Sequence, residues 1–381
     1  MTTFLLYDDA LRSPEVRHEI GEPIMDPVAF IEHDGKRIVI GSPLEESVLS
    51  AREDVIDEFW NMFGLGYLDL VKDGSFPQEL YGPELVLRAI KKVGATEAIV
   101  PPTFAIGVAD HLRAAGVEVT VGADAWADRR RKKTPWEIEG IERAQRAADT
   151  AMLTAARILR EAEPTDGGRH LRFEGEIVTA ELVREAMTTE LLNQGADTEE
   201  ILVQSGDACL KTHEPGSGPL LPDQSVVIDC FPRDRRTGVY TDMTRTFVPG
   251  IASEDLKTLH KHCRSALEMA FDSLRPGSAD AFQKVSDYFD SQGFATYLHH
   301  QGDDSLQEGF NHALGHGVGL EAHERPWMGR NSDELRAGDV VAVEPGLYIQ
   351  GIGGVRLEDT VLVTDTGVEH FTDPFPYDLE P

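Results

Sequence analysis

Residues 312–326 read HALGHGVGLEAHERP and hold three histidines and three glycines in fifteen positions. The glycines disfavour a helix, so the sequence predicts an extended chain here. Side chains alternate between the two faces of a strand. His316 and His323 lie an odd number of positions apart, so they share one site only if the chain bends between them. We therefore expect a site at a bend, whose other members come from elsewhere in the sequence.

Acidic residues interrupt three apolar stretches, which cover residues 225–248, 338–349 and 353–363. A buried carboxylate is costly unless it is paired, hydrogen-bonded or bound to a metal ion. For one aspartate alone, a salt bridge to Arg245 or a turn cap is the first interpretation. Four such residues together with a glycine-flanked histidine instead suggest a ligand set. Its members are Asp229, Asp242, His316, Glu344 and Glu358.

The charge of this set points to metal ions. Four converging carboxylates would repel one another strongly at low dielectric. Two divalent cations would neutralise them, and two ions held ~3.5–4 Å apart by bridging carboxylates form a known hydrolytic device. Oxygen ligands with one imidazole suit manganese, cobalt, iron or zinc. Arg356 shares a strand face with Glu358 because side chains alternate.

The first third of the chain alternates β-rich and helical patterns, which is typical of an α/β domain. Residues 28–41 hold two β-rich runs around Asp34-Gly35, a hairpin signal, and residues 45–63 carry apolar residues at helical spacing. A strand, a helix and a strand are expected at 97–101, 104–115 and 117–122. No glycine-rich phosphate loop follows a strand, so nucleotide binding has no support. We predict a small α/β domain over residues 1–128.

A basic run, RRRKK, follows in an otherwise acidic chain. We interpret residues 129–134 as a solvated linker between domains rather than as a binding patch. Thr134, Pro135 and Glu137 form a capping box with proline at the first helical position, so a long helix begins there. The second domain is expected to cover residues 135–381.

Within this domain, two helical stretches precede β-rich segments, and the same order then repeats. The first group has helices near 135–161 and 174–194 before strands within 199–205 and 225–248; the second has helices near 254–275 and 279–292 before strands within 313–320 and 340–364. The sequence therefore predicts a duplicated α+β domain.

The chain has 381 residues, 41% of them apolar, which is enough for two domains with sizeable cores. The formal net charge of −31 would repel nucleic acid and anionic membranes. No apolar run of ~18 residues and no charged-then-apolar leader occurs, so we expect a soluble protein of the cytoplasm. Three cysteines without a CxxC pair suit that reducing compartment, and we interpret them as inert thiols. They are Cys209, Cys230 and Cys263.

The chain contains, in this order, DCF…YTDMTRT, HALGHGVGLEAHE, VEPGLY and GGVRLEDTV. These segments resemble the ligand segments of the pita-bread metallopeptidases, particularly the branch of Xaa-Pro aminopeptidases and prolidases. KKTPWEIEGIERA resembles the start of their catalytic domain, and the similarity extends over residues 130–370. The resemblance implies a pita-bread catalytic domain, a duplicated α+β fold, preceded by a smaller creatinase-type α/β domain. It also implies a homodimeric exopeptidase that hydrolyses the bond before a proline at the second position.

The resemblance further implies a role for each ligand position. Asp229 would bind the first metal ion, and Asp242 and Glu358 would bridge the two ions. His316 and Glu344 would bind the second ion. A metal-bridging hydroxide would attack the peptide bond, and Glu344 would carry the proton to the departing nitrogen.

Four other residues match positions around the ligand set. His213, His312 and His323 would contact the substrate, His323 at the scissile carbonyl, and Arg356 would steady a ligand carboxylate. Some prolidases have a basic residue just past the proline that follows the last histidine, thought to hold the free carboxylate of a dipeptide. Here that position is Trp327. An Xaa-Pro aminopeptidase is therefore slightly favoured over a strict Xaa-Pro dipeptidase.

The expected cofactors are two divalent metal ions per subunit, with manganese first and cobalt, iron or zinc as alternatives. The expected partners are peptides with proline at the second position and a second copy of the chain; nucleic acid and membranes are excluded. Two other functions stay open, a metal-free creatinase-like hydrolase and a non-enzymatic binding module. Either would be favoured by loss of ligand carboxylates, and none is lost.

Overall fold

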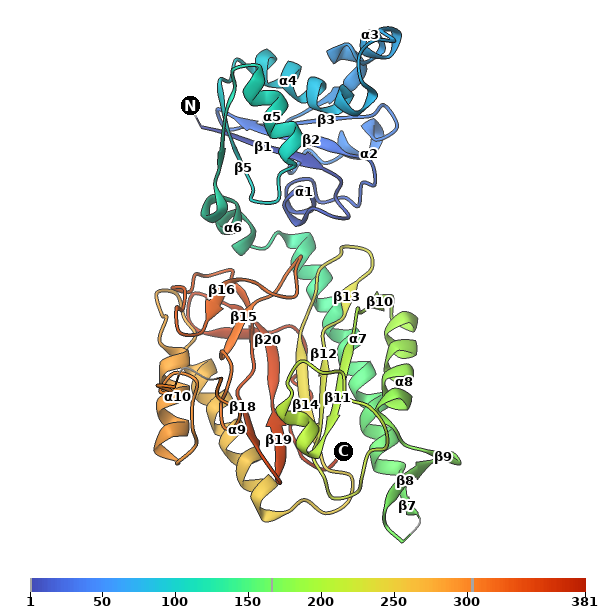
Figure 1. Ribbon diagram of the computed structural model, residues 1–381, viewed down its shortest axis with the longest axis vertical. Helices are drawn as coiled ribbons and strands as arrows, with labels where there is room; N and C mark the ends of the chain where they lie inside the picture. Colours follow the sequence, from blue (N-terminus) through green and yellow to red (C-terminus); the bar gives the residue numbers. More distant parts are fainter. Residues whose placement is uncertain (1, 166, 303–304) are drawn as a thin grey trace. The chain divides into compact units, whose positions relative to one another are not determined.

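The computed structural model describes residues 2–165, 167–302 and 305–381. The chain forms two compact units, Met1–Arg130 and Arg131–Pro381 (Figure 1). Each unit has its own hydrophobic core beside a main sheet. None of the helices in the described residues is both long enough and apolar enough to cross a bilayer.

The first unit is a six-stranded sheet covered by short helices. Its strands are β1 (Thr3–Asp8), β2 (Val28–His33), β3 (Lys36–Gly41), β4 (Glu58–Asn61), β5 (Glu97–Val100) and β6 (Glu118–Val121). Its helices are α1 (Pro14–Ile20), α2 (Glu46–Leu49), η1 (Met62–Leu65), α3 (Tyr67–Lys72), η2 (Gln78–Leu80), α4 (Tyr81–Val93), α5 (Ile106–Ala114) and α6 (Ala123–Arg131). The strand order is β4-β3-β2-β1-β5-β6, and strand side chains pack against α4 and α5. This is the α/β arrangement that the sequence predicted.

The hairpin predicted around Asp34-Gly35 is confirmed. β2 and β3 pair antiparallel and end directly at these two residues. Their φ angles are 53° and 75°, the left-handed values that a two-residue hairpin turn requires.

The helix predicted over residues 45–63 is wrong except for its first turn, α2. The chain then extends and adds β4 to the sheet, parallel to β3. Long-range hydrogen bonds outweigh the local helical pattern here. The Arg37 backbone N–H donates to the Asp57 carboxylate at 2.8 Å, and Arg52 donates to the Gly21 carbonyl oxygen at 2.9 Å.

The second unit contains the larger sheet and the long helices. Its helices are α7 (Pro135–Glu161), α8 (Ala180–Asn193), η3 (Gly206–Leu210), α9 (Glu254–Ser273) and α10 (Ala281–Ser291). Its main sheet holds β11 (Ile201–Ser205), β12 (Val226–Cys230), β14 (Met243–Phe247), β15 (Gly315–Gly317), β16 (Glu324–Met328), β17 (Val340–Val343), β20 (Glu358–Val363) and β21 (Val368–His370). Smaller sheets hold β7 (Glu163–Thr165), β8 (His170–Phe173), β9 (Glu176–Ile177), β10 (Ala196–Asp197), β13 (Arg233–Asp234), β18 (Gly346–Ile349) and β19 (Gly353–Arg356).

The predicted duplication is confirmed by the packing of this unit. α7 and α8 share one core cluster with β11, β12 and β14. α9 and α10 share a second cluster with β17, β18, β19 and β20. Figure 1 shows the two helix pairs on opposite sides of the strands. One boundary differs from the prediction, because β8 and β9 occupy residues 170–177 and α8 begins only after the cap residue Thr179.

The two halves of this unit are joined by one antiparallel strand pair, β14 with β20. The pair aligns Met243 with Asp359 and Thr244 with Glu358. The strand order is β11-β12-β14-β20-β17-β15-β16, and β21 pairs with β20 outside this path. Strands from distant parts of the sequence therefore become neighbours at the centre of the sheet.

The start of α7 follows the prediction closely. The Thr134 hydroxyl accepts the Glu137 N–H at 3.3 Å, and the Glu137 carboxylate accepts the Thr134 N–H at 2.6 Å. Ile141, Ala144 and Met152 on the predicted apolar face are fully buried. The capping box is therefore confirmed.

Residues 129–134 do not form the solvated linker that we predicted. α6 extends to Arg131, and basic side chains of the run form ion pairs, because the acidic chain offers each of them a carboxylate. The pairs are Arg129 with Glu19, Arg130 with Glu15, Arg131 with Asp339 and Lys133 with Glu324.

The pair of Arg131 and Asp339 is fully internal to the second unit. The two side chains are only 4% and 1% exposed. Arg131 Nε donates to Asp339 Oδ1 at 2.9 Å, and Nη2 donates to the Glu334 carbonyl oxygen at 2.8 Å. Such a pair contributes little net stability, but losing one partner leaves a buried uncompensated charge.

We expect Arg131→Met to lower the free energy of unfolding by about 3–5 kcal/mol, because Asp339 would stay buried without its cation. Arg146→Met is the matched control: its pair with Glu142 is mostly exposed, so its loss costs only about 0–1 kcal/mol. Urea unfolding followed by circular dichroism measures both. Similar small losses in the two variants would contradict the expectation.

Candidate metal centre

The five side chains predicted as metal ligands line one cavity of about 430 Å³ in the second unit. Asp229 lies in β12, Asp242 directly precedes β14, and Glu358 begins β20. Glu344 directly follows β17, and His316 lies in β15. These five strands are consecutive neighbours in the sheet. The sheet order therefore brings together residues that lie up to 129 positions apart in the chain (358 − 229).

The ligand atoms of Asp242, His316 and Glu358 lie within 4.8 Å of one another. His316 Nε2 is 3.8 Å from Asp242 Oδ2 and 3.9 Å from Glu344 Oε1. The imidazole of His316 and the carboxylates of three residues thus surround one small space. The three are Asp242, Glu344 and Glu358.

Two carboxylate oxygens at the cavity lack a hydrogen-bond donor. Oδ1 of Asp229 and Oδ1 of Asp242 are buried without a hydrogen-bond partner among the described residues. A buried acceptor without a partner costs free energy, and a cation is the partner that a carboxylate oxygen lacks here. Oxygen donors with one imidazole fit a divalent ion such as Mn²⁺.

The carboxyl groups are strongly perturbed. Burial raises the pKa of Asp242 well above its usual range, and the charges of Glu358 and Asp229 raise it further. Burial also raises the pKa of Glu358, and the charges of Glu344 and Asp229 add to that effect. Divalent cations would oppose both causes, because they attract the ionised form.

His316 has the protonation state that a metal ligand needs. Burial lowers its pKa, so the ring is neutral near pH 7. Its Nδ1 lies 3.0 Å from the Gly317 carbonyl oxygen, and a carbonyl can only accept, so Nδ1 carries the proton. The lone pair is therefore on Nε2, the atom that faces Asp242 and Glu344.

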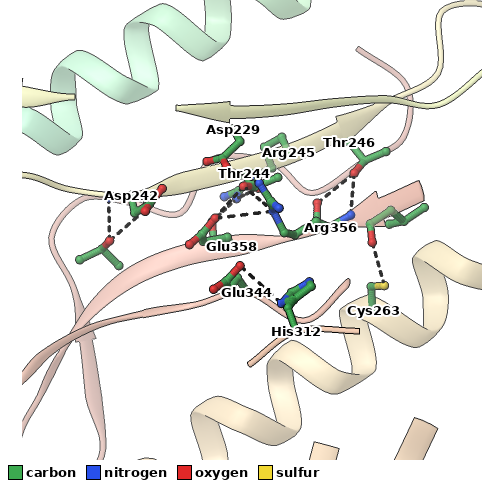
Figure 2. A network of polar contacts seen from close by, with 12 residues as sticks. Asp229, Asp242, Thr244, Arg245, Thr246, Cys263, His312, Glu344, Arg356 and Glu358 are labelled. Carbon is green, nitrogen blue, oxygen red and sulfur yellow. Dashed lines mark hydrogen bonds and ion pairs between the residues drawn. The ribbon is translucent and has the colours of Figure 1, made fainter. Parts of the chain in front are cut away.

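Arg356 supplies the positive charge beside these carboxylates. Its guanidinium contacts the Asp229 carboxylate, and Nε donates to Thr244 Oγ1 at 3.0 Å. Thr244 in turn donates to Glu358 Oε2 at 2.6 Å. Burial opposes the charge of Arg356, but the carboxylates, Asp229 foremost, raise its pKa well above the usual value. Figure 2 shows the side chain between Asp229, Thr244 and Glu358.

The bend predicted between His316 and His323 is confirmed. β15 and β16 pair antiparallel, and their register shifts between His316 and Gly317. The turn between the strands returns the chain, so the two rings lie 4.3 Å apart between centroids. Both histidines line the cavity.

The other two predicted histidines also reach the cavity. His312 Nδ1 lies 2.7 Å from the Ala313 carbonyl oxygen and 3.7 Å from Glu344 Oε2, and Figure 2 shows the two side chains turned toward each other. His213 follows η3 and is exposed to solvent at the cavity wall.

The sequence interpretation missed two residues of the site. Thr244 hydrogen-bonds both Arg356 and Glu358; it lies two positions after Asp242, so strand alternation alone could have found it. Tyr348 is fully buried, and its hydroxyl lies 3.1 Å from His312 Nε2. Nothing in its local sequence indicated that contact.

Comparison with known proteins agrees with this geometry. The sequence profile of metallopeptidase family M24 matches residues 139–365. The Xaa-Pro dipeptidase of Pyrococcus furiosus is 31% identical over 253 residues. That alignment covers 65% of this chain and 65% of the relative, so the chain spans just under two thirds of the relative's length.

Solved structures with low sequence identity share the fold. The Xaa-Pro dipeptidase from Bacillus anthracis superposes with a TM-score of 0.76 at 23% identity, covering 99% of this chain and 94% of that one. The X-Pro aminopeptidase from Thermotoga maritima superposes with a TM-score of 0.74 at 19% identity, covering 99% and 97%. The predicted pita-bread fold is therefore confirmed.

We expect Mn²⁺ to raise the melting temperature more at pH about 8 than at pH about 6. A carboxyl with a raised native pKa stabilises the metal-free protein at low pH, and this contribution is lost as pH rises through that native pKa. The ion needs the ionised form, so protons compete with it at Asp242 and Glu358 over a higher pH range than at exposed carboxyls.

Differential scanning calorimetry with and without Mn²⁺ at the two pH values measures this difference. The double variant Asp242→Asn, Glu358→Gln is the control and should lose the metal-dependent shift. A shift of equal size at both pH values would contradict the assigned pKa directions.

Proposed function

The chain belongs to metallopeptidase family M24, and on that premise we propose that it is a metal-dependent exopeptidase. It releases the first residue from peptides that have proline at the second position. The observation that carries this proposal is the set of five ligand side chains on five neighbouring strands, around one cavity. The named relatives support the preference for proline.

We propose that Asp229, Asp242, His316, Glu344 and Glu358 hold two divalent ions, with manganese as the first candidate. Four carboxylates against the single guanidinium of Arg356 leave a net charge of about −3, which supports more than one divalent ion. When bound, the ions supply an activated water and polarise the scissile carbonyl. Arg356 acts through Asp229, whose carboxylate it holds in place.

Glu344 is the proton carrier in this proposal. Its side chain is 18% exposed, more than Asp242 at 7% or Glu358 at 3%, so it can reach the substrate. The departing proline nitrogen must gain a proton to leave as an amine, and a positioned carboxyl supplies it. His312 lies beside Glu344 and orients it.

The remaining histidines bind the substrate. Burial lowers the pKa of His323, so its ring is neutral near pH 7 and can donate a hydrogen bond to the scissile carbonyl without adding charge. His213 at the exposed wall contacts the peptide backbone.

We favour an aminopeptidase over a strict dipeptidase. A dipeptidase must hold the free carboxylate of its substrate, and a cation is the usual partner for that group. Among the described residues that line the cavity, Arg356 is the only arginine or lysine, and Asp229 already occupies it. Trp327 stands at the rim, 44% exposed. The Xaa-Pro dipeptidase alternative is supported by the named relative at 31% identity.

We also propose a homodimer in the cytoplasm. The first unit exposes Leu44, Phe63, Leu68 and Val71, apolar area that a second copy would cover. The three cysteines are free and buried, which suits a reducing compartment. The acidic net charge of −31 disfavours nucleic acid as a partner.

We expect Glu344→Gln to lower kcat by at least ~100-fold, because the amide can neither accept nor deliver the proton. Hydrolysis of Ala-Pro-Ala after loading with Mn²⁺ measures the loss. Glu268→Gln, an exposed change in α9, is the control with unchanged turnover. If the wild-type chain turns over no Xaa-Pro peptide with any divalent ion, the metal-free hydrolase or the binding module takes the place of this proposal.

We expect Trp327→Arg to raise kcat/KM for Ala-Pro relative to Ala-Pro-Ala by roughly 5-fold, because the new cation pairs with the carboxylate of the dipeptide. Trp327→Phe keeps an aromatic ring without the charge and should leave the ratio unchanged. The wild-type ratio itself separates the two functions. Turnover of dipeptides alone would decide for the dipeptidase.

A further inference from the structure

The wall of the cavity formed by Glu200, Leu202, Thr212, His213 and Phe231, called its outer half below, differs in character from the metal centre. Leu202 and Phe231 line it with apolar side chains, and Thr212 and His213 border it. Glu200 is a carboxylate of this outer half with no place in the ligand set. This wall of the cavity therefore places a carboxylate beside an apolar surface.

The pairing of β11 with β12 fixes where this carboxylate lies. Leu202 is aligned with Asp229, and Ile201 with Cys230. Because side chains alternate, Ile201 packs into the core beneath the helices, whereas Leu202 and Glu200, two positions earlier, face the cavity. Glu200 therefore lies roughly 6–7 Å before Leu202 along the chain, away from the level of Asp229.

No cationic side chain of the described residues forms an ion pair with Glu200. Its carboxylate is exposed and has no ion pair or side-chain hydrogen bond among the described residues. Arg184 lies in an adjoining hollow that Glu200 also borders. That guanidinium donates to the carbonyl oxygens of Pro215 at 2.6 Å and Gly216 at 3.0 Å, and lies 3.7 Å from Glu181. The negative charge of Glu200 is thus available to a ligand.

We propose that Glu200 selects peptides whose first residue is lysine or arginine; this inference rests on the exopeptidase function proposed above. Long cationic side chains lay their methylene groups on apolar surface and keep the charged end at a polar group. Leu202 and Phe231 supply the apolar surface for the methylene groups, and Glu200 supplies the carboxylate for the charged end. The outer half of the cavity therefore offers a matching surface to both parts of such a side chain, its methylene groups and its charged end.

The chemistry of the substrate and the strand order assign this selection to the first residue. Proline at the second position carries no charge, so Glu200 cannot select there. Glu200 directly precedes β11, and Trp327 lies in β16, the strand at the opposite end of the sheet order. A peptide that crosses the metal centre therefore has its first residue near Glu200 when the rest of its chain leaves past Trp327.

The test compares Lys-Pro-Ala with norleucine-Pro-Ala, which has a side chain of similar length without the charge. The corresponding dipeptides replace them if the enzyme accepts only dipeptides. We expect kcat/KM to be roughly 5- to 10-fold higher for the lysine peptide, and the ratio to fall as salt screens the exposed carboxylate. Glu200→Gln should remove the preference and leave norleucine-Pro-Ala within about twofold of the wild-type value. Glu200→Lys should turn the preference toward Glu-Pro-Ala.

Glu199→Gln is the matched control. The Glu199 carboxylate accepts the Tyr240 hydroxyl at 2.8 Å and lies 3.7 Å from Arg233, so it is already paired and the lysine preference should persist. An equal loss for both peptides in Glu200→Gln would overturn the proposal and assign Glu200 to the α-ammonium group instead. A Glu200-dependent preference for Ala-Pro-Lys over Ala-Pro-norleucine would assign the charge to the third residue and also overturn it.

These outcomes are distinct from failure of the exopeptidase function. If norleucine-Pro-Ala is hydrolysed without any preference for lysine, the function stands and the selection by Glu200 is wrong. If no Xaa-Pro peptide is hydrolysed after metal loading, both proposals are wrong.

Discussion

The second unit depends on one constraint: buried carboxylates that repel one another are held close together by the main sheet. The pair of β14 with β20 sets this spacing, because it aligns Thr244 with Glu358 and brings Asp242 beside them. The Thr360 hydroxyl fixes the backbone of Asp242 with contacts of 2.9 Å to its N–H and its carbonyl oxygen. Since these residues lie on the strands or directly next to their ends, the strand pairing limits how far the carboxylates can move apart.

The chain offsets this repulsion only in part. Arg356 contacts Asp229, and Thr244 donates to Glu358, but in the part of the chain that the structure describes an oxygen of Asp229 and one of Asp242 have no hydrogen-bond donor. Burial raises the pKa of both Asp242 and Glu358, and the charges of the neighbouring carboxylates raise it further. Natural proteins keep such a local conflict where a functional site needs it. Here the carboxylate oxygens without a hydrogen-bond partner are the atoms that fit a divalent cation.

The cavity joins two environments with different tasks. Its inner half holds the acidic ligand side chains and histidines on the strands or close to their ends, and hydrolysis needs fixed distances between such groups. Its outer half holds the apolar side chains of Leu202 and Phe231. Glu200, next to β11, and Trp327, in β16, lie at opposite ends of the strand order.

Features that depend on neighbouring residues could be predicted from the sequence. Strand alternation, the turn at Asp34-Gly35, the capping box at Thr134 and the residue types of the ligand set were all readable from short stretches. Local patterns failed at residues 45–63 and 129–134, where contacts from distant segments outweigh them. Two features are visible only in the folded chain: β12, β14, β20, β17 and β15 are consecutive neighbours, and the Arg356 guanidinium hydrogen-bonds the Asp229 carboxylate. Strand order and such pairings join residues far apart in the chain, and no local periodicity encodes which distant strand lies alongside.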